Sequence, residues 1–247
     1  MFDAGQAASG GWVLKGGYAL ELRFHRARST KDLDFTVRLD RSGPGEREGH
    51  LRERLQQAAE ISLPDFFTFI VGEESLALDQ APAGGSRFPV DARLDGRTFV
   101  KFHVDLGLGD EVLEPTERLS GEDWLGFAGI PPVNIPALSA EQHWAEKLHA
   151  YTLPRGGATN SRAKDLVDLV MLIEWHALRP GPLREAVRAT FNRRRTHAVP
   201  TTIPAPPSTW TKPFAALATE CGLHESSANA HAKVDAFWRS LASEGAT

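Results

Sequence analysis

The chain has 247 residues, of which 41% are hydrophobic and 24% charged, and its formal net charge is −4. These values are ordinary for a globular protein of one or two domains, and they exclude a chain that is basic throughout, so a nucleic-acid partner requires a local basic patch. The single cysteine, Cys221, excludes an internal disulfide and is typical of the cytoplasm, and no apolar run approaches the roughly 20 residues of a membrane helix.

The strongest pattern in the sequence begins near residue 12. A short apolar run, Trp12 to Leu14, ends at Lys15-Gly16-Gly17 and predicts a strand that turns into a helix. Glycines let backbone N–H groups approach an anion closely, and a helix N-terminus adds a partial positive charge. The pattern favours a bound phosphate, whereas its plainer interpretation is a turn.

Two carboxylates follow on the next predicted strand, Lys31 to Val37. Side chains two positions apart on a strand point the same way, so Asp32 and Asp34 share one face. Neighbouring carboxylates repel each other unless a cation lies between them, and Mg²⁺ prefers oxygen ligands and substrate phosphates. The pair predicts a magnesium site beside the phosphate-binding turn, and the alternative is a solvated strand edge.

The clearest hairpin has Asp95-Gly96 at its turn, between strands predicted over 88–94 and 97–106. In its second strand Asp105 lies on the polar face with His103, which we expect to be only a neighbour. Periodicity leaves two interpretations of Asp105 open, a third metal ligand or part of a plain polar strand face. The segment before this hairpin, 81–87, is predicted to be a loop.

Three prolines, Pro131, Pro132 and Pro136, predict a break between two domains, 1–135 and 136–247. The second domain is predicted to be helical. Ser139 and Gln142 form a capping box at the start of its first helix, which carries Lys147. Further helices are predicted over 162–178, 183–191, 213–221 and 226–241.

The charged residues of this half have structural interpretations. Lys164 and Asp168 are four apart and are compatible with a surface ion pair, and Lys147 is equally compatible with a purely structural contact to Asp168 between two helices. Three consecutive arginines, 193–195, are either a solvated helix end or a grip on RNA phosphates.

Several of these segments together resemble the signature of the AbiEii/AbiGii nucleotidyltransferase toxins, which belong to the polymerase-beta-like nucleotidyltransferase superfamily and are related to the mycobacterial MenT toxins. The sequence departs from the family at Tyr18, where Ser or Thr is more common. The segments that carry the resemblance are Leu14-Lys15-Gly16-Gly17-x-Ala19-Leu20, Thr30-Lys31-Asp32-Leu33-Asp34-Phe35, Val104-Asp105-Leu106-Gly107, Ala145-Glu146-Lys147-Leu148 and Arg162-x-Lys164-Asp165-Leu166-x-Asp168-Leu169.

The resemblance implies an α+β fold with a mixed nucleotidyltransferase sheet and a helical C-terminal domain. It also implies a site in which Asp32, Asp34 and Asp105 hold one or two Mg²⁺ ions. The choice between Asp165 and Asp168 as the acid that acts with Lys147 stays open. The catalytic residues expected are Asp32, Asp34, Asp105, Lys147, Asp165 and Asp168, and the nucleotide-binding residues expected are Lys15, Gly16, Gly17, Tyr18, Lys147 and Arg162.

The activity that the resemblance implies is magnesium-dependent transfer of NMP from an NTP to an acceptor hydroxyl at the 3′ end of tRNA. The protein is then the cytoplasmic toxin of a toxin–antitoxin pair, with a separate antitoxin protein as partner and no membrane association. The alternatives are a nucleotidyltransferase that modifies a small molecule or a protein, and an inactive nucleotide-binding homologue. An NTP-hydrolysing loop is set aside because the sequence has no G-x-x-x-x-G-K-[ST] pattern.

Overall fold

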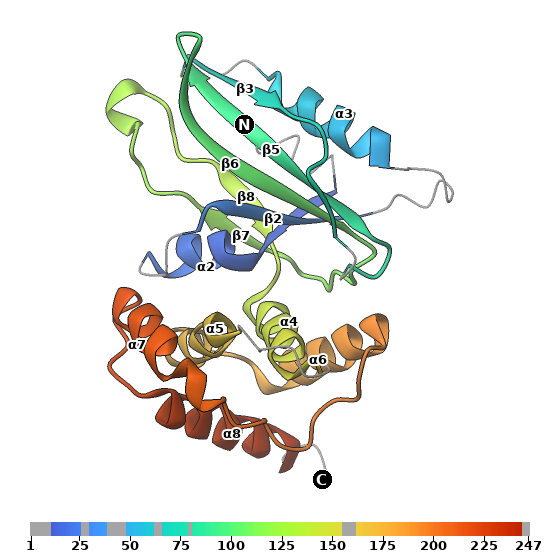
Figure 1. Ribbon diagram of the computed structural model, residues 1–247, viewed down its shortest axis with the longest axis vertical. Coiled ribbons are helices and arrows are strands. Elements are labelled where there is room, and N and C mark those ends of the chain that lie inside the picture. Colours follow the sequence, from blue (N-terminus) through green and yellow to red (C-terminus); the bar gives the residue numbers. More distant parts are fainter. Residues whose placement is uncertain are drawn as a thin grey trace. The chain divides into compact units, whose positions relative to one another are not determined.

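The computed structural model describes residues 11–25, 30–38, 48–61, 66–78, 81–154 and 162–243 (Figure 1). The described chain divides into two units, with the boundary between Leu138 and Ser139. Among the described helices, none combines the length and the apolar character needed to cross a membrane.

The first unit is built on a mixed sheet, as the sequence predicts. Its described strands follow the order β3-β5-β6-β2-β1-β8-β7, with the short β4 paired to β5. The pairs β2–β6 and β1–β8 are parallel and the other pairs are antiparallel. The strands are β1 (Trp12–Lys15), β2 (Asp32–Val37), β3 (Phe67–Val71), β4 (Leu76–Ala77), β5 (Gly85–Leu94), β6 (Arg97–Leu108), β7 (Glu117–Ser120) and β8 (Asn134–Ala137).

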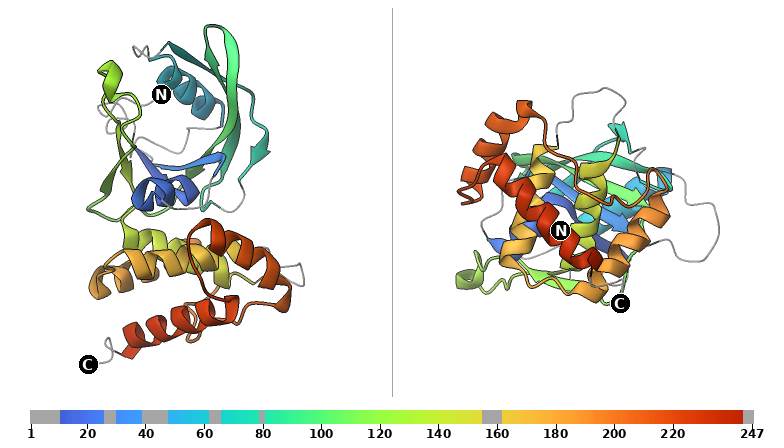
Figure 2. Two further views of the ribbon diagram at one scale, coloured as in Figure 1. Left: turned by 90° about the vertical axis from the view of Figure 1, so that its left-hand side faces the viewer. Right: turned by 90° about the horizontal axis from the view of Figure 1, so that it is seen from below.

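The core of this unit fixes the orientation of β2. Helices α2 (Gly16–Phe24) and α3 (Glu48–Ala59) pack side chains into one hydrophobic cluster with the sheet, and the sheet curves around α3 (Figure 2, left). Phe35 and Val37 of β2 belong to this cluster and are 2% and 1% exposed. Because side chains alternate along a strand, Asp32 and Asp34 lie on the opposite face of β2.

The loop expected over 81–87 is wrong in its second half, because β5 already begins at Gly85. A Cβ atom at Gly85 would lie 2.3 Å from the carbonyl oxygen of Leu106, so glycine permits a close approach of the two strands here. The register of β5 on β6 also shifts between Ala92 and Arg93, where the pairing is irregular. The register shift decides which side chains of β5 face the acids.

A strand also forms where the prolines predict only a break. Strand β8 contains Pro136, pairs with β7 over its whole length and meets β1 in parallel at Ala137 opposite Leu14. A short strand tolerates proline where its missing N–H is not needed for the ladder. The prolines therefore precede the boundary between the units instead of forming it.

The second unit is helical, as expected. Ser139 caps the first helix by accepting a hydrogen bond from the backbone N–H of Gln142 at 3.2 Å, and Trp144 stacks on Trp238 with ring centres 5.9 Å apart. The helix expected over 183–191 is longer, because Pro180 lies at its first position, where a missing N–H has no cost. The helices are α4 (Ala140–Thr152), α5 (Ala163–Trp175), α6 (Pro180–Arg194), α7 (Thr211–Glu220) and α8 (Ser227–Ser243).

Candidate active site

The three acids predicted from the sequence lie on one face of two adjacent strands. Asp34 of β2 is the register partner of Asp105 of β6, and Asp32 is the partner of His103. Register partners on neighbouring strands are about 5 Å apart and point to the same side of the sheet. The structure therefore brings Asp105 beside the Asp32–Asp34 pair.

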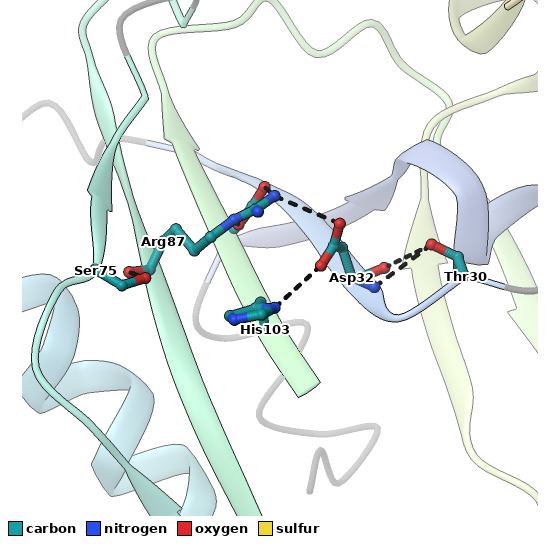
Figure 3. Close-up of polar contacts among 6 residues, drawn as sticks. Thr30, Asp32, Ser75, Arg87 and His103 are labelled. Carbon is teal, nitrogen blue, oxygen red and sulfur yellow. Dashed lines mark hydrogen bonds and ion pairs between the residues drawn. The ribbon is translucent and has the colours of Figure 1, made fainter. Parts of the chain in front are cut away.

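A fourth charged residue, Arg87 of β5, enters this group. Its Nε and Nη2 atoms donate to Oδ1 and Oδ2 of Asp105, each at 2.7 Å, and Nη2 lies 3.4 Å from Oδ2 of Asp32. Figure 3 shows Arg87 reaching toward Asp32 from its own strand. The hydrogen bonds to Asp105 raise the pKa of Arg87 further above its usual value, so the guanidinium is permanently charged.

The acids do not surround a common point in this arrangement. Within the described residues, no three His, Cys, Asp or Glu side chains are placed to hold one metal ion. Asp32 and Asp105 instead converge on the guanidinium of Arg87. The donor types still fit Mg²⁺, because carboxylate oxygens from neighbouring strands are ligands that this ion prefers.

Asp32 has further contacts that fix its position. The Nδ1 atom of His103 lies 3.3 Å from Oδ1 of Asp32, and the hydroxyl of Thr30 contacts the backbone of Asp32 at 3.4 Å (Figure 3). His103 thus contacts the acid site, and the expectation that it is only a neighbour stays a prediction. The side chain of Asp32 stays 38% exposed, so it remains accessible to a ligand.

The diglycine turn lies directly against the acids. Gly16 has φ +68° and begins α2, whose N-cap makes no side-chain hydrogen bond. A Cβ atom at Gly16 would lie 2.0 Å from Oδ2 of Asp34. The first turn of α2 therefore places backbone N–H groups and a partial positive charge beside Asp34.

Lys15 is held by an acid that the sequence reasoning missed. Its ammonium forms an ion pair with Oδ2 of Asp110, and the two side chains are 15% and 3% exposed. The ammonium also lies close to Gly107 of β6, whose added Cβ would be 3.5 Å from it. Asp110 lies beyond the end of β6, so strand periodicity gave no signal for it. The pair connects the end of β1 to the end of β6.

Tyr18 has a structural role in addition to any contact with nucleotide. It is half-buried on α2 and packs against the hydrophobic cluster of the first unit. Burial raises the pKa of its phenol, and the nearby Glu21 raises it further, so the hydroxyl is neutral near pH 7. Its predicted role in nucleotide binding stays a prediction.

In the second unit, Lys147 of α4 contacts both candidate acids of α5. Its Nζ atom lies 2.6 Å from Oδ2 of Asp168 and 3.6 Å from Oδ1 of Asp165, and the acid side chains are at most 1% exposed. The contact between Lys147 and Asp168 is confirmed, and a solvated surface pair with Lys164 does not explain the burial of Asp168. Arg162 approaches the other oxygen of Asp165 at 3.5 Å.

A mixed sheet with acids in register beside a diglycine turn, together with a helical second unit, defines a nucleotidyltransferase fold. The chain matches the family described as "Nucleotidyl transferase AbiEii toxin, Type IV TA system" over residues 3–240. It therefore belongs to the AbiEii nucleotidyltransferase toxins of type IV toxin–antitoxin systems. No curated protein sequence matches it.

Solved structures are similar to this chain at low sequence identity. The nucleotidyltransferase toxin MenT4 from Mycobacterium tuberculosis H37Rv superposes with a TM-score of 0.50 and 16% identity, over 92% of this chain and 80% of that chain. JHP933 from Helicobacter pylori gives a TM-score of 0.45 and 18% identity, over 98% of this chain and 95% of that chain.

Proposed function

We propose that the protein transfers NMP from an NTP to the 3′-terminal hydroxyl of tRNA in a reaction that depends on Mg²⁺. The observation that carries the proposal is the register of Asp34 and Asp105 on adjacent parallel strands, with Gly16 in contact with Asp34. Paired carboxylates beside a helix N-terminus combine a cation site with a phosphate site. Membership of a nucleotidyltransferase toxin family supports the same chemistry.

The candidate site residues of the first unit divide the work of this reaction between metal binding and phosphate binding. Asp32, Asp34 and Asp105 would hold one or two Mg²⁺ ions, which when bound lower the pKa of the acceptor hydroxyl and polarise the α-phosphate. The backbone N–H groups of Gly16 and Gly17 donate to the β- and γ-phosphates. Lys15 adds positive charge near this turn while Asp110 fixes its ammonium.

The second unit contributes a buried cation. We propose that Lys147 stabilises the negative charge that develops on the triphosphate. Electrostatic groups of this kind lower the activation free energy by about 2.7–4 kcal/mol. Asp168, whose Oδ2 lies 2.6 Å from Nζ of Lys147, orients the ammonium. Asp165 contacts both Lys147 and Arg162. The family resemblance adds Tyr18 and Arg162 to the residues that we propose for nucleotide binding.

The choice of tRNA and the cellular role rest on the family resemblance. A toxin of a type IV system has a cognate antitoxin, so we propose an antitoxin protein as a partner in the cytoplasm. Modification of tRNA ends would stop translation, which accounts for toxicity without any membrane partner.

The assay that tests this function uses each of the four NTPs, labelled at the α-phosphate, with total tRNA and Mg²⁺. We expect label from one or more NTPs in full-length tRNA, and loss of that label when the 3′-hydroxyl of the RNA is oxidised beforehand. Label in a protein or in a small molecule, but not in RNA, would select the alternative acceptors. Nucleotide binding without any transfer would identify an inactive homologue.

A further inference from the structure

Arg87 lies among the three carboxylates that the proposed function assigns to a divalent cation. Its two donors engage both oxygens of Asp105 at 2.7 Å, and one of them also reaches Asp32 at 3.4 Å. A guanidinium matches a carboxylate in this two-point geometry, which gives the strongest class of side-chain hydrogen bond. The guanidinium of Arg87 is therefore a cation that the chain itself places beside these carboxylates.

The sheet builds this contact into the fold. Arg87 is the register partner of Asp105, so the two side chains emerge opposite each other on neighbouring strands. The carbonyl oxygen of Arg87 accepts hydrogen bonds from the backbone N–H of Ser75 at 2.9 Å and from its hydroxyl at 3.1 Å. The side chains of Arg87 and Asp105 are only 28% and 10% exposed, so solvent screens their attraction weakly.

A guanidinium and a divalent ion at this place oppose each other. Both seek the oxygens of Asp105, and both are positive, so each lowers the affinity of the acids for the other. Without either cation, three neighbouring carboxylates would repel one another. The carboxylates therefore need the guanidinium of Arg87 in the metal-free protein, and a divalent ion must bind beside or in place of that guanidinium.

We propose that Arg87 is an internal counter-ion of the acid site: it holds Asp105 and Asp32 in the metal-free protein and competes with the divalent ion for Asp105. This inference rests on the proposed function, because it takes the three acids as the metal ligands. Arg87 acts on the ion through the acids and is therefore a positioning residue. Its presence keeps the intrinsic affinity of the site for divalent ions low.

The test measures Mn²⁺ binding to the full-length protein without nucleotide, from the electron paramagnetic resonance signal of the free ion at constant salt. Arg87→Gln removes the charge and leaves a polar side chain, so we expect its Kd for Mn²⁺ to fall at least about tenfold, which corresponds to about 1.4 kcal/mol. Arg87→Lys keeps the charge but loses the two-point contact, and a smaller fall is expected.

The matched control is Arg93→Gln. Arg93 lies on the same strand and also pairs with a carboxylate, with its Nε 2.8 Å from Oδ2 of Asp91, but this pair is outside the acid site. Its Kd for Mn²⁺ should equal that of the wild type. A second readout is stability, because Mn²⁺ should raise the melting temperature of Arg87→Gln more than that of the wild type.

The inference is overturned if Arg87→Gln and Arg87→Lys bind Mn²⁺ no more tightly than the wild type, whether all three affinities are high or low. That result would leave Arg87 as a structural brace of Asp105. The proposed metal site fails separately, if Asp34→Asn binds Mn²⁺ in the presence of an NTP as tightly as the wild type. The two failures are therefore distinguishable.

Discussion

Gly16 and Asp34 are in such close contact that a Cβ atom on Gly16 would lie 2.0 Å from Oδ2 of Asp34. The phosphate-binding turn and the acid site are thus one physical unit, and a change in the turn must displace the acid. Gly16 also has φ +68°, a conformation that other residues adopt only with strain.

Gly16→Ala should therefore reduce transfer activity by about 100-fold or more, the loss that a displacement of 1 Å can cause. Its control is Gly96→Ala at the hairpin turn, where φ is +73° and no atom beyond the neighbouring residues of the chain lies within 4 Å of the added Cβ. Both variants should lose about 1–2 kcal/mol of stability from backbone strain, measured by urea unfolding, and Gly16→Ala should lose more because its Cβ also displaces Asp34. Equal transfer activity in the two variants would contradict the claim that a change at Gly16 displaces Asp34.

Substitution of Lys147 measures how much a buried cation stabilises the second unit. Lys147→Met leaves Asp165 and Asp168, which are at most 1% exposed, without their shared ammonium. Breaking a buried pair in this way should cost about 3–5 kcal/mol in the free energy of urea unfolding. Adding Asp168→Asn to Lys147→Met should cost less than the sum of the two single changes, because it removes one of the uncompensated charges.

The control for this change is Lys233→Met. Lys233 also contacts two carboxylates, those of Glu174 and Glu225, but its side chain is 35% exposed. Exposed ion pairs contribute about 0–1 kcal/mol, so this variant should lose little stability. Similar losses for Lys147→Met and Lys233→Met would contradict the account of the buried cluster.

The sequence predicts the elements of this fold well, because local patterns determine them. The alternation in β2 correctly separates Phe35 from Asp34, and the capping box marks the start of α4. The sequence offers a contact between Lys147 and Asp168 as one interpretation, and the structure contains that contact. In these places local rules and the final structure agree.

The position of Arg87 beside Asp105 could not be predicted from the sequence. Counting pairs outward from the Asp95-Gly96 turn without interruption would place Arg87 opposite Val104, on the core side of β6. The shift between Ala92 and Arg93 moves the register by one residue and places Arg87 opposite Asp105. A shift of one residue reverses the face of every side chain beyond it, and nothing in the local sequence marks where the shift occurs.

His197 gives a prediction for pH. Its ring lies between two hydroxyls, with Nε2 2.8 Å from Oγ1 of Thr152 and Nδ1 3.0 Å from Oγ1 of Thr196, and burial lowers its pKa below the usual value. The unfolded chain, with an ordinary pKa of about 6.5, then binds more protons than the folded one as the pH falls. His197 therefore contributes to a loss of stability below about pH 6.5 that ends once the pH is below the folded-state pKa.

Urea unfolding at pH 7.5 and pH 5.5 measures this effect. The wild type should lose more stability than His197→Gln over this interval, because the variant lacks the titrating ring. An equal loss in both proteins would show that protonation of His197 is not coupled to folding.

The central claim is that the aspartates of β2 and β6 carry nucleotidyl transfer. Its most direct test is the transfer of α-phosphate-labelled NMP to tRNA by Asp34→Asn, compared with the wild type and with Asp91→Asn, a strand aspartate of the same sheet outside the acid site. We expect Asp34→Asn to keep the wild-type circular dichroism spectrum and to lose detectable transfer, while Asp91→Asn stays active. Transfer by Asp34→Asn at the wild-type rate would contradict the account.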